Sequence, residues 1–309
     1  MSSGRADGRH YPLNEDGGSS NLREPILPVF YNGGEGTENL QMTMPIDLVL
    51  VRHGESEGNA ARRFSTAGDN SVFTDEFCSR HSSRLRLTDR GREQARVAGG
   101  WLKKNIGEHF DRYLVSGYLR AMETAALLEL PEAVWFQEFY LRERDMGLFE
   151  IMSEDDKKNK HPEVYRQYEL DPFYWTPPNG ESIAQLCLRI DRVLHTLHRE
   201  CSEKRVLIVG HGLVMWAFMV RIERLTPTQF LERSQSRDIA DHIRNCQIIH
   251  YTRRSPDSAV LSSRVEWVRS VCPWDTTESG GKWGTIQRPT FTNEQLREAA
   301  ESSRRVLAG

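Results

Sequence analysis

The sequence predicts an α/β protein of three layers, in which a mostly parallel sheet is covered by helices on both faces. Short apolar runs rich in β-branched residues alternate along the chain with longer amphipathic helical patterns. Two of the runs, Ile46–Val51 and Arg205–Val209, are continuous, as is typical of strands buried on both faces. A polar pair, histidine and glycine, closely follows each of them, and α/β enzymes commonly place their chemistry where strands end.

The first elements follow from composition and capping signals. Residues 1–44 are rich in Gly, Ser, Asn and Glu, so we expect a flexible N-terminal tail and a folded domain over residues 45–255. Residues 60–86 are polar, and we expect an irregular connection of unusual length there. Thr88 is a good N-cap and predicts a helix that runs to about residue 105.

The later elements alternate in the same way. Further strands are expected at 111–116, 133–137 and, as an edge strand, 247–252. Further helices are expected at 119–130, 182–199, 212–224 and 227–232. Residues 145–180 are charged, aromatic and proline-rich, which indicates a small, partly helical flap inserted over one end of the sheet. We expect residues 256–309, with three tryptophans among polar residues, to wrap back over the domain.

Composition limits the classes of partner. Hydrophobic residues make up 38% of the 309, and the net charge of −3 gives no reason to expect nucleic acid or a membrane surface as partner. The five cysteines form no CxxC pair, so neither a zinc site nor a disulfide framework is indicated. The chain starts without a signal-peptide pattern and has no apolar stretch that could span a bilayer. We therefore expect a cytoplasmic protein.

The two histidine-glycine pairs are the strongest functional signal. In a parallel sheet, His53 and His211 would both emerge at the carboxyl edge, although they are far apart in sequence. Their flanking glycines let the backbone approach an anion closely. A single histidine after a strand is usually structural, but two in the same context, one preceded by Arg52, favour a shared site.

At this point a resemblance becomes specific. The run Leu50–Ser56 (LVRHGES) resembles the RHG signature of the histidine phosphatase superfamily, which includes phosphoglycerate mutases and the fructose-2,6-bisphosphatase domain. The resemblance covers residues 46–252 and implies a phosphoglycerate mutase-like fold. Five further motifs follow in the family's order: Leu87–Ala95 (LTDRGREQA), Ser116–Ala125 (SGYLRAMETA), Leu141–Gly147 (LRERDMG), Asn179–Ser182 (NGES) and Val209–Gly212 (VGHG).

The resemblance implies a role for each matching residue. His53 would attack phosphorus as a neutral nucleophile, and Arg52 and Arg120 would hold the phosphoryl oxygens. His211 would donate to a phosphoryl oxygen, and Glu143 would protonate the leaving oxygen and then deprotonate water. The implied phosphate-binding set is Arg52, His53, Asn59, Arg120, His211 and Gly212.

Two of these assignments have competitors or irregularities. Glu138 and Glu150 lie near Glu143 in the sequence, so three carboxylates are candidates for the acid. The tryptophan that usually precedes the family asparagine is replaced here by Gly58, which weakens the assignment of Asn59.

Departures from the mutase pattern favour hydrolysis. Met146 stands where mutases have tyrosine, and the later region has Arg166 without an adjacent second arginine. The flap offers Phe173, Tyr174 and Trp175, which suit a larger leaving group. The sequence thus predicts a phosphomonoesterase that acts on a small phosphorylated metabolite without a cofactor or metal. A phosphoglycerate mutase-type phosphotransferase is the alternative, and an inactive phospho-ligand binding module is a weaker one.

Overall fold

The computed structural model describes residues 42–238, 241–276 and 280–307 of the chain. The expected tail therefore lies outside the described residues, apart from its last three positions. Thr43 donates its backbone N–H to Ser202 Oγ over 3.0 Å, and Met44 packs against the hydrophobic core. Ordered contacts with the domain thus begin at least as early as Thr43.

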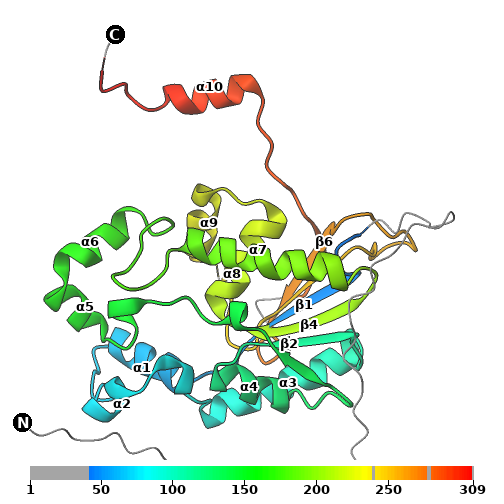
Figure 1. The fold of residues 1–309 in the computed structure, drawn as a ribbon, viewed down its shortest axis with the longest axis horizontal. Helices are drawn as coiled ribbons and strands as arrows, with labels where there is room; N and C mark the ends of the chain where they lie inside the picture. The colour runs from blue at the N-terminus through cyan, green and yellow to red at the C-terminus, as the bar shows by residue number, and fades with distance from the viewer. Residues whose placement is uncertain (1–41, 239–240, 277–279, 308–309) are drawn as a thin grey trace, which may run out of the picture. The chain divides into compact units, whose positions relative to one another are not determined.

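A mixed sheet forms the centre of the domain (Figure 1). Among the described residues it has seven strands in the order β3-β2-β4-β1-β5-β6-β7. The first four are parallel to one another, and β5, β6 and β7 each run antiparallel to the strand before them in this order. The strands are β1 (Asp47–Arg52), β2 (Arg112–Val115), β3 (Trp135–Gln137), β4 (Arg205–Gly210), β5 (Ile248–Thr252), β6 (Trp267–Val271) and β7 (Gly284–Thr285).

The prediction that residues 247–252 form an edge strand is wrong. Strand β5 lies between β1 and β6, and all five of its residues are buried. Its outer neighbour comes from the segment after residue 255, where β6 pairs with it in register from Ile248 opposite Val271 to Thr252 opposite Trp267. The hydrogen bonds that an edge strand would leave open are therefore made by a part of the chain that carries only a weak strand pattern.

Helices cover both faces of the sheet, as predicted. The α-helices are α1 (Glu57–Thr66), α2 (Asp75–Ser79), α3 (Asp89–Asn105), α4 (Leu119–Leu127), α5 (Glu154–Lys160), α6 (Pro162–Leu170), α7 (Ile183–Glu200), α8 (Gly212–Glu223), α9 (Pro227–Ser234) and α10 (Asn293–Glu301). Short 3₁₀ turns occupy Ser82–Arg84, Phe139–Leu141 and Gly147–Phe149. Figure 1 shows α3 and α4 on one side of the strands and α7 and α8 on the other.

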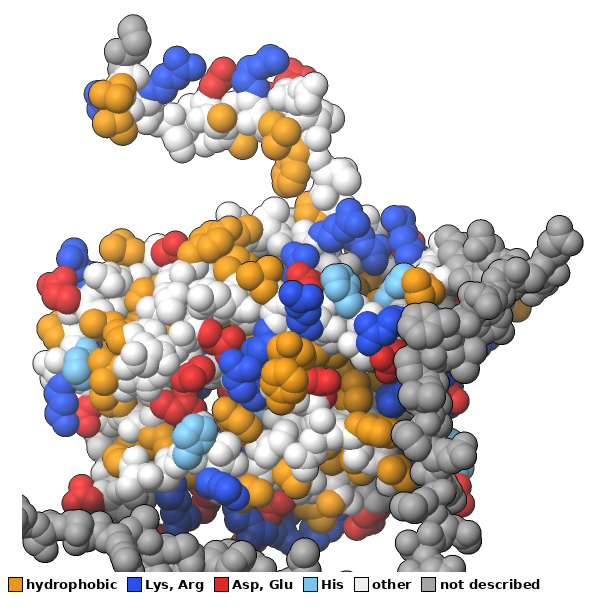
Figure 2. Space-filling model, in the orientation of Figure 1, with side chains coloured by type: hydrophobic (Ala, Val, Ile, Leu, Met, Phe, Trp, Pro, Cys, Tyr) orange, Lys and Arg blue, Asp and Glu red, His pale blue; other side chains and the backbone are white. Residues whose placement is uncertain are grey.

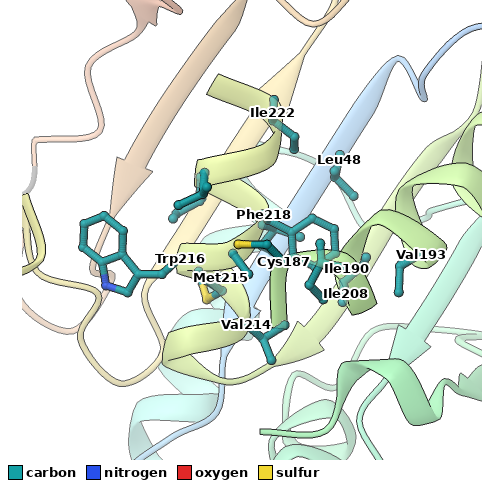
Figure 3. Close-up of a cluster of buried hydrophobic side chains, with 14 of the residues drawn as sticks. Leu48, Cys187, Ile190, Val193, Ile208, Val214, Met215, Trp216, Phe218 and Ile222 are labelled. Atoms are coloured by element: carbon teal, nitrogen blue, oxygen red, sulfur yellow. The ribbon is translucent and has the colours of Figure 1, made fainter. Parts of the chain in front are cut away.

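Alternation along β1 divides the core in two. Leu48 and Leu50 belong to the hydrophobic cluster on the face covered by α7 and α8. Figure 3 shows part of this cluster, with Leu48 labelled. Val49 and Val51 point to the opposite face, among the alanines and leucines of α3 and α4. A strand whose successive side chains are all apolar can bury both of its faces, which is why the continuous runs in the sequence became the central strands.

The connection after β1 is more helical than we predicted. Residues 57–66 form α1, because Ser56 accepts a hydrogen bond from the backbone N–H of Asn59 while the Asn59 side chain accepts from the Ser56 N–H. This capping box starts a helix in a segment with few apolar residues. The helix buries only Ala61 and Ser65, so its polar composition reflects a solvated face rather than an irregular loop.

Surface charge is distributed rather than concentrated on the face seen in Figure 2. There, Lys and Arg side chains of the described residues are interspersed with Asp and Glu. No helix in the described part of the chain is long and apolar enough to cross a membrane.

Candidate active site

The main chain fixes His53 at the end of β1. Its backbone N–H donates to Gly210 O over 2.9 Å, and its carbonyl accepts from the backbone N–H of Cys246. The Asn245 side chain donates to the same carbonyl over 3.1 Å. The side chain of His53 is 2% exposed. Strands β1 and β4 and the segment before β5 thus hold this residue from three sides.

The His53 ring is oriented for nucleophilic chemistry. Nδ1 lies 2.7 Å from Gly54 O, and since a carbonyl only accepts, we assign the ring proton to Nδ1. Nε2 then carries the electron pair, which accepts a hydrogen bond from the Arg120 Nε–H over 3.2 Å. Burial, with the charges of Arg120 and Arg52, lowers the pKa of His53 well below its usual value. The imidazole is therefore neutral at neutral pH.

Two arginines flank this ring. Arg120, in the first turn of α4, donates from Nη1 to Ser82 O over 2.6 Å and lies over the Tyr118 ring. Arg52 donates from Nη1 to Ile243 O over 2.6 Å. Burial lowers the pKa of Arg52 to about 10, so it remains a cation at neutral pH. The site therefore places two fixed positive charges beside a neutral imidazole, an arrangement that can bind an anion next to the ring.

His211 lies beside His53 but is fully buried. The two ring centroids are 5.2 Å apart, and His211 also meets Tyr118 edge-on at 5.1 Å. Its Nε2 is 2.7 Å from Ser116 Oγ, while Nδ1 has no hydrogen-bond partner among the described residues. Burial, then Arg120, lowers the pKa of His211 well below its usual value, so this ring is neutral as well. The sequence correctly placed both histidines at one edge of the sheet.

Of the three candidate carboxyl groups, Glu143 fits best. It lines the cavity at His53, and burial raises its pKa, opposed by the charges of Arg120 and Arg52. Glu138 does not line this cavity, and its carboxylate accepts instead from the Tyr140 backbone N–H. Glu150 does line it and accepts from the Met146 backbone N–H, much as Glu143 accepts from the Arg144 backbone N–H over 2.9 Å, so what favours Glu143 is a buried carboxyl with a raised pKa. A carboxyl with a raised pKa is the one suited to keep a proton for transfer.

Asn59 and Gly212 also line the cavity, each with a constraint. The Asn59 Oδ1 accepts from Ser56 N–H and from Asn245 Nδ2, at 3.1 and 3.0 Å. A Cβ on Gly212 would lie 3.3 Å from Arg52 Nε, so glycine makes room for the guanidinium. Sequence reasoning missed Asn245, which joins the Asn59 side chain to the His53 carbonyl, because only the fold brings residue 245 to the end of β1.

A close approach between two backbones supports the loop after His53. A Cβ on Gly54 would lie 2.2 Å from Gly91 O, and one on Gly91 would lie 2.0 Å from Glu55 O. Neither position can hold a side chain without moving main chain. The glycine in the first turn of α3 is thus required so that this helix can press against the His53 loop.

The cavity at His53 has a volume of about 560 Å³. This is the range in which pockets enclose whole small molecules. The strand ends, α1, the flap and α8–α9 all contribute to its wall. Besides the residues above, the lining includes Arg62, Ser82, Leu85, Arg144, Phe149, Lys157, Tyr165, Tyr168, Leu213, Trp216, Phe230, Leu231 and Ile243.

The flap contributes different aromatics from those we expected. Phe173 is buried in the main hydrophobic core against Phe230, Trp175 is buried within the flap and Tyr174 is 59% exposed. None of the three lines the cavity. Tyr165 and Tyr168 of α6 do line it. The sequence signal that could have identified them is their spacing of three residues, which places both rings on the same side of a helix.

Among the described residues, no three His, Cys, Asp or Glu side chains gather into a group that could hold a metal ion.

Comparison with known proteins gives a consistent result. Residues 48–253 match the model of the histidine phosphatase superfamily (branch 1). A 2,3-bisphosphoglycerate-dependent phosphoglycerate mutase from Brucella melitensis biotype 2 is 30% identical over 224 residues, which are 71% of this chain and 97% of the relative. Its counterpart from Methylobacterium radiotolerans is 31% identical over 188 residues, 59% of this chain and 81% of the relative.

Solved structures share the fold at lower identity. The alpha-ribazole phosphatase from Shigella flexneri superposes with a TM-score of 0.53 at 21% identity, covering 71% of this chain and 95% of that one. A mycobacterial glucosyl-3-phosphoglycerate phosphatase in complex with VO3 gives 0.53 at 19% identity, covering 71% and 96%.

Proposed function

Because this chain belongs to the histidine phosphatase superfamily (branch 1), we propose that it is a phosphohydrolase that works through a phosphohistidine at His53. The observation that carries the proposal is the state of His53. It is buried and neutral, its proton is on Nδ1, and Nε2 faces a guanidinium at 3.2 Å. A nucleophile in this state needs no base to activate it.

In the first step, the Nε2 electron pair forms a bond to phosphorus while the bond from phosphorus to the ester oxygen breaks. Glu143, whose pKa is raised by burial, gives its proton to the leaving alcohol. Arg52 and Arg120 offset the charge on the phosphoryl oxygens, which is most of what this reaction asks of a protein. His211, neutral and buried beside His53, does not itself line the cavity, but it would donate to a phosphoryl oxygen bound there.

In the second step, the Glu143 carboxylate takes a proton from water as the water oxygen attacks phosphorus. The bond from phosphorus to Nε2 breaks, inorganic phosphate leaves, and His53 is again neutral with its proton on Nδ1. The same carboxyl serves both steps because it is protonated before the first and ionised before the second.

The substrate we propose is a small phosphorylated metabolite, since the cavity is large enough for a whole small molecule. Mutase activity is the second candidate, because relatives at 30–31% identity are named phosphoglycerate mutases. Against it stand Met146 in place of the mutase tyrosine and the missing second arginine next to Arg166.

Brief incubation with a radiolabelled aryl phosphate, in the presence of EDTA, tests the mechanism. We expect acid-labile, base-stable phosphate on the wild-type protein and none on His53→Asn, with turnover abolished in the variant. His195→Asn, at an exposed position on α7, is the matched control and should label normally. Label on serine or cysteine, or activity that EDTA removes and a divalent ion restores, would contradict the proposal. Transfer between positions of phosphoglycerate faster than phosphate release would favour the mutase.

A further inference from the structure

Helix α1 carries two adjacent arginines that belong to different cavities. Arg62 lines the catalytic cavity. Arg63 lines a neighbouring cavity, which Arg52 also lines, and its guanidinium lies 3.4 Å from Glu55 there. Both side chains are exposed, so the pair offers a natural comparison between a cation that faces the site and one that does not.

Arg62 differs from the other cations that line the catalytic cavity. Arg52 and Arg120 donate to main-chain carbonyls, and so does Arg144. Lys157 donates to Glu154 over 2.6 Å. The Arg62 carbonyl accepts from Thr66 Oγ1 over 2.9 Å, but within the residues that the structure describes the Arg62 guanidinium makes no hydrogen bond and no ion pair. An arginine has five N–H donors, so this side chain brings unused binding capacity into the cavity.

The position of Arg62 relative to the reaction centre is also informative. Its charge acts on Arg52, Arg120 and Glu143, so it lies within electrostatic range of the place where the phosphoryl group would bind. It belongs, however, to the wall that α1 shares with the flap. There the Glu154 backbone N–H donates to Ser65 Oγ over 3.0 Å, one turn further along α1. Because His53 and Arg62 line the same cavity, there is room along this wall for the alcohol portion of an ester whose phosphate meets His53.

We propose that Arg62 binds a second anionic group, a carboxylate or another phosphate, on the alcohol portion of the substrate. This rests on the proposed function and narrows its substrate class to phosphomonoesters that carry a further negative charge. A guanidinium fits either group through two parallel N–H bonds. The part of the lining that α8 and α9 supply is mostly apolar, with Trp216, Phe230 and Leu231, so the second charge would be held on the α1 side, at Arg62.

Two matched pairs of substrates test this. Glycerol 3-phosphate and 3-phosphoglycerate differ by a carboxylate, and glucose 6-phosphate and glucose 1,6-bisphosphate differ by a phosphate. We expect the wild type to prefer the more anionic member of at least one pair, in kcat/KM for phosphate release. Arg62→Gln should reduce that preference by about 10- to 100-fold, the size of a hydrogen bond between charged groups, and glycerol 3-phosphate should change by less than about threefold. The pair that responds identifies the anion.

Arg63→Gln is the matched control and should leave both preferences unchanged. Equal losses on all four compounds in Arg62→Gln would overturn the inference, because Arg62 would then bind the transferred phosphate itself. No change on any compound would also overturn it, as would a wild type without preference in either pair. Hydrolysis of p-nitrophenyl phosphate reports separately on the proposed function. Calorimetric binding of the same four compounds to His53→Asn, with and without Arg62→Gln, tests the subsite without any turnover.

Discussion

Two regions that share one cavity are built in opposite ways. The catalytic edge, made of Arg52, His53, Arg120 and His211, consists of side chains that are buried or bonded to main-chain and neighbouring groups. In the flap, residues 145–180, helix α6 buries no residue at all. Its two cavity-lining tyrosines, Tyr165 and Tyr168, contact each other, and Tyr168 also contacts Trp175. The difference suggests a division of labour, since phosphoryl transfer needs fixed geometry while recognition of an alcohol can vary with a surface segment.

After the loss of His53 itself, the largest effect should come from replacing the proposed acid at the edge, Glu143. Glu143→Gln should lower kcat for an alkyl phosphate by about 10²–10⁴-fold, because the leaving oxygen loses its proton donor and water loses its base. With an aryl phosphate, the variant should form phosphoenzyme quickly and then stall, which rapid-quench labelling would detect. Glu138→Gln, at a carboxyl outside the cavity, is the control. Wild-type rates in Glu143→Gln would shift the assignment to Glu150.

The close approach of α3 to the His53 loop should be the next most sensitive feature. Gly91→Ala places a methyl group 2.0 Å from Glu55 O, so we expect a loss of about 3 kcal/mol in the free energy of unfolding, together with lower activity. Gly100→Ala, in the same helix with nothing within 4 Å of the new methyl, should be neutral or stabilise by up to about 1 kcal/mol. Urea unfolding measures both. Similar values for the two variants would show that the loop tolerates displacement.

Acid should destabilise the protein through its buried histidines. The pKa of His53 is lowered well below 6.5 in the folded state. As the pH falls below about 6.5, the unfolded chain therefore binds a proton that the folded chain does not. The free energy of unfolding should fall by up to about 1.4 kcal/mol per pH unit for each such group. His53→Asn should show a shallower decline between pH 7.5 and 5.5 than His195→Asn, and equal slopes would contradict the buried neutral state.

The smallest effect is expected in the flap. Tyr168→Ala should alter the ranking of substrates by kcat/KM by up to about tenfold while leaving labelling of His53 intact, since this ring lines the cavity. Tyr174→Ala, at a ring that is 59% exposed, should leave the ranking unchanged. If the two variants behave alike, the flap aromatics act on stability alone, and the comparison between edge and flap loses its functional meaning.

Local patterns were enough to predict most of the fold. Helix α3 begins at the N-cap Thr88, and the central strands match the continuous apolar runs within a residue or two. Both histidines could be placed at one edge from their position after parallel strands. The polar segment after β1 was misread, because a capping box and two buried side chains suffice to form α1 there.

The sequence by itself determined the elements with strong local periodicity, the two strand ends and the residue types that meet there. Only the tertiary structure decided the neighbours of β5, the role of Asn245, and which flap aromatics reach the cavity. It also decided that Arg62 enters the catalytic cavity while Arg63 beside it does not. The physical reason is that capping and alternation act between residues close in the chain. Burial, charge and hydrogen bonding act through space, and His53 and Asn245 meet across 192 positions of sequence.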